Sequence, residues 1–146
     1  MTRVPLPVRA LALGAATGGR SVAGLAALAR SRDDLGPLSG SAGRVALTLA
    51  QLGEGVGDKL PMTPSRLAPP ALTARVVAGT AGGLLLARSE RQAYPVPALL
   101  GAVGALAGSW AGARWRAVTG SRVPDWASAL VEDAVVVALA TWAARA

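Results

Sequence analysis

The sequence predicts an all-α protein, a polytopic bundle of about five transmembrane helices that forms one domain over residues 1–146. Hydrophobic residues make up 52% of the chain, and the mean hydropathy is positive. They form nearly uncharged runs close to the length that crosses a bilayer core of about 30 Å. Many of the 18 glycines lie within these runs, and phenylalanine is absent. Small residues allow close helix packing in lipid, so the expected packing is rich in Gly and Ala.

Composition also excludes several classes of function. The chain contains neither cysteine nor histidine, so disulfides, thiolate metal sites and imidazole catalysis are ruled out. We expect no metal and no cofactor. The net charge of +7 is carried mainly by arginines that separate the apolar runs. A nucleic-acid binder would cluster these residues beside aromatic side chains, so the expected partners are membrane lipids and not nucleic acid.

The first apolar run covers residues 10–30 and is interrupted by Gly18, Gly19 and Arg20. A signal peptide is one interpretation, but an arginine in the middle of the run argues against it. In a spanning helix Arg20 would lie near the bilayer centre, where a charge costs about 2.5 to 3.5 kcal/mol. We therefore expect one of three forms. The segment is one helix in which Arg20 is paired or lines a wet cavity, or a broken or re-entrant segment, or a shorter helix from which Arg20 reaches the interface.

The second helix is predicted over residues 42–59 and carries a polar stripe about 140° wide. The stripe comprises Arg44, Thr48, Gln51, Glu54, Asp58 and Lys59. In a soluble protein such a stripe would face water. Three glycines between residues 53 and 57 would each cost about 1 kcal/mol there, which favours a helix packed in lipid with its polar stripe turned inward.

Prolines between residues 61 and 70 end this helix, and two further spans are expected at residues 71–88 and 94–114. Residues 92–113 carry no charge, the strongest membrane signal in the chain. Glycines recur there every four residues, which gives one helix face a ridge without side chains. The ridge consists of Gly104, Gly108 and Gly112. It predicts close packing within one protomer or, less directly, a homodimer or assembly subunit.

The fifth span is expected at residues 126–144, with Trp126 and Trp142 near its ends as in an aromatic belt. Glu132 and Asp133 lie about a third of the way along it. Two acids at that depth are too costly to face lipid. We expect them to face protein or water, with arginines as partners.

The predicted functional residues are therefore polar groups inside the bundle: Arg20, Gln51, Glu54, Asp58, Glu132 and Asp133. They could line the path of a small transporter or channel-like protein, because acids in a low-dielectric site can bind protons or cations. Alternatively, they form a structural salt-bridge network without transport.

A third group, Lys59, Arg66 and Arg75, is expected near one mouth of the bundle, where it could bind an anionic lipid headgroup or substrate. Lys59 and Arg66 match the opening of the lipid phosphatase signature. That signature also requires proline after the arginine and catalytic histidines. Leu67 follows Arg66 and the chain has no histidine, so we do not expect an enzyme.

Three segments resemble the bacterial small membrane proteins of domain-of-unknown-function family 4126 (DUF4126): GGRS at 18–21, GDKLPMTPSRLAPP at 57–70 and VPDWASALVEDAV at 123–135. The resemblance implies an integral membrane protein and no established activity. The residues it carries over are Gly19, Arg20, Asp58, Lys59, Pro61, Pro64, Arg66, Pro69, Asp125, Glu132 and Asp133.

The location implied is the bacterial cytoplasmic membrane, crossed several times. Five spans divide the basic residues slightly unevenly between the two sides, with the larger share on the side of the N-terminus. The positive-inside rule therefore predicts a cytoplasmic N-terminus.

Overall fold

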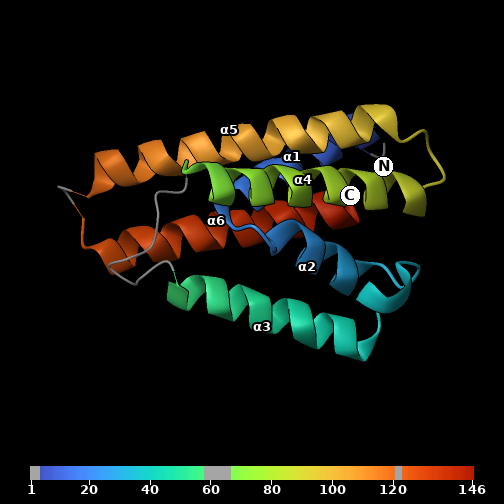
Figure 1. The fold of residues 1–146 in the computed structure, drawn as a ribbon, viewed down its shortest axis with the longest axis horizontal. Coiled ribbons are helices and arrows are strands. Elements are labelled where there is room, and N and C mark those ends of the chain that lie inside the picture. Colours follow the sequence, from blue (N-terminus) through green and yellow to red (C-terminus); the bar gives the residue numbers. More distant parts are fainter. Residues whose placement is uncertain (1–3, 58–66, 121–122) are drawn as a thin grey trace.

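A computed structural model describes residues 4–57, 67–120 and 123–146, and these residues are helical with no strand (Figure 1). The all-α prediction is therefore confirmed for this part of the chain. The helices are α1 (Leu6–Gly19), α2 (Ala23–Ser31), the 3₁₀ helix η1 (Gly36–Leu38), α3 (Ser41–Gly57), α4 (Pro69–Ser89), α5 (Pro95–Thr119) and α6 (Asp125–Arg145). Proline in the first turn helps to start α1, α4 and α5, because its missing N–H would have no partner within the helix.

The first apolar run forms two helices, not one. Arg20 adopts an extended conformation after α1, and α2 begins at Ala23. The chain then turns back toward the start of α1. The evidence is that the first turn of α1 and the end of α2 contact the same residue. Arg9 and Arg32 both donate hydrogen bonds to Glu90. Helices α1 and α2 are thus the broken, re-entrant form of the first segment, with Arg20 at the turn.

Helix α1 lies at the centre and contacts α2, α4, α5 and α6. Its closest neighbour is α5, because glycines on both helices remove the side chains between them. A Cβ atom added at Gly104 would overlap the backbone of Leu11, and one at Gly108 would overlap the backbone of Ala15. Two residues of the predicted glycine ridge therefore pack within the chain.

Large apolar side chains cover the outside of the bundle, although its core consists mostly of alanine and leucine. Helix α3 shows this inversion most clearly. Its Val45, Leu49 and Leu52 are 58 to 63% exposed, whereas Gln51 and Glu54 hydrogen-bond to the α1–α2 hairpin. A helix with its polar face inward and its apolar face outward suits hydrocarbon surroundings.

Three helices in the described residues are long and apolar enough to cross a membrane, namely α4, α5 and α6. Helix α3 has only 17 residues, and the α1–α2 hairpin turns back inside the bundle. The structure thus supports a transmembrane helical protein without confirming five spans.

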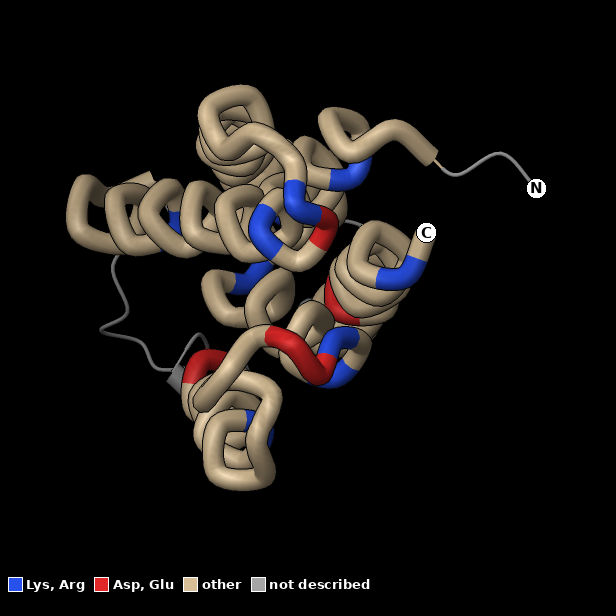
Figure 2. Tube along the Cα trace, turned by 90° about the vertical axis from the view of Figure 1, so that its right-hand side faces the viewer, with Lys and Arg blue, Asp and Glu red and all other residues tan. Residues whose placement is uncertain are grey.

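The hairpin also changes which chain ends lie together. A single first span would place the start of α1 and the end of α6 on opposite sides. Instead, Arg9 donates from Nε to the carbonyl oxygen of Ala143 over 2.9 Å, so both lie at one end of the bundle. Figure 2 looks onto this end, where basic and acidic segments of different helices adjoin.

Candidate functional site: a polar layer at the helix break

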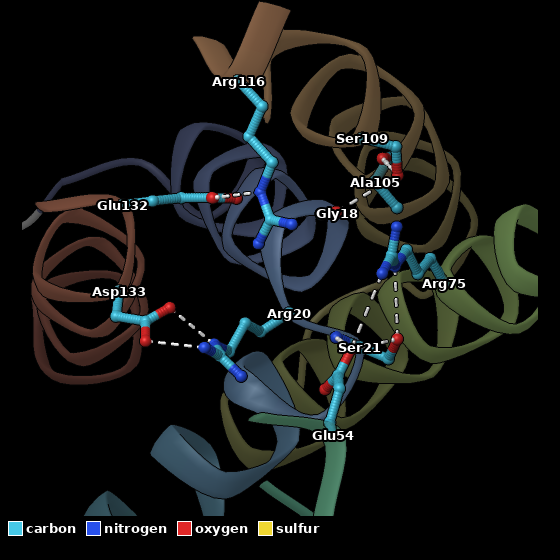
Figure 3. A network of polar contacts seen from close by, with 10 residues as sticks. All are labelled: Gly18, Arg20, Ser21, Glu54, Arg75, Ala105, Ser109, Arg116, Glu132 and Asp133. Atoms are coloured by element: carbon cyan, nitrogen blue, oxygen red, sulfur yellow. Dashed lines mark hydrogen bonds and ion pairs between the residues drawn. The ribbon is translucent and has the colours of Figure 1, made fainter. Parts of the chain in front are cut away.

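Charged side chains from four helices surround the turn between α1 and α2 (Figure 3). We call this group the polar layer; it comprises Arg20, Ser21, Glu54, Arg75, Arg116, Glu132 and Asp133. Its three arginines and three acids are equal in number. The layer therefore carries no net formal charge.

Arg20 binds Asp133 on α6 directly. Its Nε and Nη2 atoms donate to Oδ1 and Oδ2 over 2.6 Å each. The Arg20 side chain is 13% exposed and that of Asp133 is 35% exposed. This two-bond geometry is the strongest arginine–carboxylate arrangement, so the guanidinium at the turn of the hairpin is paired, as expected for an arginine within an apolar run.

Glu54 on α3 binds the turn itself. Its Oε1 accepts hydrogen bonds from the backbone N and from Oγ of Ser21, both over 2.8 Å. Ser21 precedes the first turn of α2, where backbone N–H groups lack partners within the helix and the helix dipole favours an acid. The Oε2 atom of Glu54 is buried without a hydrogen bond to any described residue.

Arg75 on α4 completes this part of the layer. It is only 4% exposed, its Nε donates to Ser21 Oγ over 3.3 Å, and its Nη2 lies 3.7 Å from Glu54 Oε1. The sequence pattern grouped Arg75 with cations at a mouth of the bundle. The structure instead buries it against Glu54, because its position on α4 faces the hairpin.

Glu132 has a different partner from its neighbour Asp133. Its Oε2 accepts from Nε of Arg116 on α5 over 3.1 Å. The Glu132 side chain is 8% exposed, whereas that of Arg116 is 40% exposed. Successive helical residues point about 100° apart, so the two acids connect α6 to two different elements.

The remaining predicted residues lie elsewhere. Gln51 accepts a hydrogen bond from Nη2 of Arg30, on α2, over 2.7 Å, and so braces α3 outside the layer. Asp58, Lys59 and Arg66 lie outside the described residues. Gly112 lines a cavity between α5 and α6.

A second charged cluster, missed by the sequence pattern, ties together the other end of the bundle. The fully buried Arg9 donates to Ala143 and, with Arg32, to Glu90. Burial would raise the pKa of Glu90, but hydrogen bonds from both arginines and their positive charge lower it below its usual value. Arg9 looked like an ordinary flanking cation, because nothing local in the sequence indicates carbonyl groups 134 residues away.

Ser109 on α5 was also missed. Its buried Oγ donates to the carbonyl oxygens of Ala105 and, over 3.2 Å, Gly18. Gly18 lies in the last turn of α1, where carbonyl groups lack partners within the helix. Ser109 directly follows Gly108 of the glycine ridge, and this position was the available signal.

Residues of the polar layer can exchange one charged partner for another. Their described arrangement indicates no reaction that forms or breaks a covalent bond. In the part of the chain that the structure describes, no three acidic, histidine or cysteine side chains group closely enough to hold a metal ion. Each described acid in the layer is held by an arginine or by the turn of the hairpin. A charged ligand would bind here by replacing one of these partners.

Comparison with protein-family models, curated proteins and solved structures found no match to this chain. The resemblance to DUF4126 therefore stays a prediction.

Proposed function

We propose that this chain is an integral membrane protein, a small transporter or channel-like protein whose ion or substrate site is the polar layer. The observation that carries the proposal is the break between α1 and α2 at Arg20, among acids from α3 and α6. Membrane transporters often place substrates at helices that are interrupted within the bilayer. Non-helical backbone at that depth is tolerated where it is enclosed by protein or lines a cavity.

The best candidate for ion binding is Glu54. One of its oxygens takes both hydrogen bonds from Ser21, while the other is buried without a described donor. A proton or cation could bind that second oxygen. Loss of the Glu54 charge would weaken the contacts from Ser21 and Arg75 that attach α3 to the hairpin, which would couple ion binding to movement of α3.

A structural ion-pair network is the second candidate. It is favoured by the two short bonds between Arg20 and Asp133, which hold α6 on the hairpin. Buried pairs of this kind occur without transport, and breaking one by removing a partner costs about 3 to 5 kcal/mol. The two candidates differ in what a conservative change does to flux when the fold is intact.

Purified protein in liposomes provides the test. A potassium gradient with valinomycin sets the membrane potential, and a pH-sensitive dye inside the vesicles reports proton flux. We expect flux with the wild type and at least a tenfold loss with Glu54→Gln at an unchanged unfolding temperature. The matched control is Asp34→Asn, which removes an exposed acid outside the layer and should keep wild-type flux.

Two results would count against transport through the layer. One is equal flux in Glu54→Gln and Asp34→Asn. The other is loss of flux together with a lowered unfolding temperature in Glu54→Gln, which favours the structural network. Wild-type vesicles no leakier than protein-free vesicles would exclude a proton path.

Membership of DUF4126 and a place in the bacterial cytoplasmic membrane with a cytoplasmic N-terminus are also part of the proposal. The resemblance at residues 18–21, 57–70 and 123–135 supports the first. Because α1 and α2 form a hairpin, basic residues near the end of α2, the start of α3, the α4–α5 turn and the end of α6 join the N-terminal side, which supports a cytoplasmic N-terminus. A homodimer stays a prediction.

A further inference from the structure

A cavity of about 400 Å³ lies between α5 and α6, with α1 as its floor. Glycine and aliphatic side chains line it except at one end, where Trp115 and Glu132 are found. The side chains that bear on its use are Ala15 on α1, Gly112 and Trp115 on α5, and Val135 and Leu139 on α6. Its volume lies within the range of small-molecule sites in proteins.

The cavity exists because α5 and α6 both pack on α1 and contact each other little. Where α5 faces α6 it presents small residues, among them Gly108 and Gly112. The opposing Val135 is 60% exposed. An apolar groove therefore runs along the outside of the bundle between these two helices.

We expect the hydrocarbon chains of lipids to occupy this groove. Both α5 and α6 are long and apolar enough to cross a membrane, so the space between them opens toward lipid. Along α6 it extends from Val131 to Leu139, about 12 Å at 1.5 Å per residue. That length matches an acyl chain within one leaflet of a bilayer core about 30 Å thick.

The polar end of the groove suits a phosphate. Arg116 lies in the last turn of α5, and its side chain is 40% exposed. Its Nε donates to Glu132, which holds the guanidinium at the end of the groove. A guanidinium presents several N–H donors in a planar arrangement that suits the oxygens of a phosphate.

We propose that this groove binds a membrane phospholipid, with one acyl chain between α5 and α6 and the phosphate on Arg116. Trp115 contributes an amphipathic ring at the same depth, as tryptophan does at membrane surfaces. The site goes beyond the proposed transport function, although it shares Arg116 and Glu132 with the polar layer. It uses neither Glu54 nor the turn of the hairpin.

Native mass spectrometry of the detergent-purified protein tests the site with two probes that share their acyl chains, dioleoyl phosphatidylglycerol and dioleoylglycerol, which lacks the phosphate. We expect the wild type to retain one phosphatidylglycerol about 10-fold to 100-fold more tightly than dioleoylglycerol, from charge-assisted hydrogen bonds to one phosphate. In Arg116→Ala this preference should disappear. The matched control is Arg114→Ala, because the Arg114 guanidinium lies over the Trp110 ring, whereas that of Arg116 is bonded to Glu132, which lines the cavity.

A second pair of variants tests the acyl chain. Val135→Trp fills the groove with a large side chain at an exposed position and should lower retention of both probes at least tenfold. Val137→Trp places the same side chain on α6 at a position 49% exposed that does not line the cavity, and should bind like the wild type. Neither position belongs to the polar layer, so proton flux separates failure of this inference from failure of transport.

Three results would overturn the proposal. The first is that Val135→Trp retains both probes as tightly as Val137→Trp does. Arg116→Ala could keep the wild-type preference for phosphatidylglycerol. Val135→Trp could instead turn a wild-type dimer into a monomer, which would identify the groove as an interface between two copies of this chain.

Discussion

Replacing Gly104 with alanine tests the close packing that positions the polar layer. An added Cβ at Gly104 would overlap the carbonyl oxygen of Leu11 and lie 2.8 Å from the nitrogen of Ala15, where ordinary contacts begin at 3.4 Å. Both atoms belong to the backbone of α1, so no side chain can move aside. Helices α1 and α5 would have to separate by several tenths of an ångström at least.

The cost of that separation can be estimated from packing alone. Overfilling a close-packed site typically costs 1 to 3 kcal/mol, and a gap of 0.5 to 1 Å forfeits about a quarter to a half of each dispersion contact. Lipid supplies no hydrophobic force to hold the helices together. We therefore expect Gly104→Ala to lose about 2 to 3 kcal/mol of unfolding free energy and about 4 to 12 °C in Tm.

Thermal unfolding in detergent, followed by circular dichroism, measures the effect. The control is Gly53→Ala on α3, where an added Cβ meets nothing within 4 Å. This variant should be as stable as the wild type, or more stable by up to about 1 kcal/mol. A Tm for Gly104→Ala equal to that of Gly53→Ala would refute the close approach of α1 and α5.

Two further predictions concern the charged clusters. Because the pKa of Glu90 is lowered in the folded protein, its contribution to stability is complete above its unfolded pKa and is lost as the pH falls below about 4.5. Thermal unfolding between pH 3 and 7 should show a smaller acid loss in Glu90→Gln than in the wild type, and equal losses would contradict the ion pairs. Arg20→Lys keeps the charge but lacks the planar fork that makes two parallel bonds to Asp133, so we expect a loss of about 1 kcal/mol. The same change at the exposed Arg30 should alter Tm much less, and equal shifts would argue against a special pair at Arg20.

The local pattern of the sequence was sufficient for much of the fold. Apolar runs and proline positions placed α3, α4 and α6 within two residues of their observed bounds and α5 within five, because both properties act along the chain. The run at residues 10–30 was predicted as one span but forms two helices. Arg20 and the acids of α6 were also identifiable, since charges inside apolar runs need partners. The polar stripe on α3 was recognisable from its helical period. Whether the stripe faces into the bundle or outward depends on whether lipid or water surrounds the helix.

The local sequence pattern did not predict which groups the arginines bind. Arg20 meets Asp133 across 113 positions, Arg75 is buried on Glu54, and Arg9 binds the carbonyl groups of α6 only because α1 and α2 form a hairpin.

Chain composition thus established a helical protein rich in small residues, with charges that must face inward. Only the tertiary structure decided which arginine meets which acid, and that the first apolar run turns back instead of crossing. The physical reason is that hydropathy and periodicity are properties of neighbouring residues. Ion pairs between helices depend on how closely the backbones approach, and here glycine contacts between α1 and α5 set that distance.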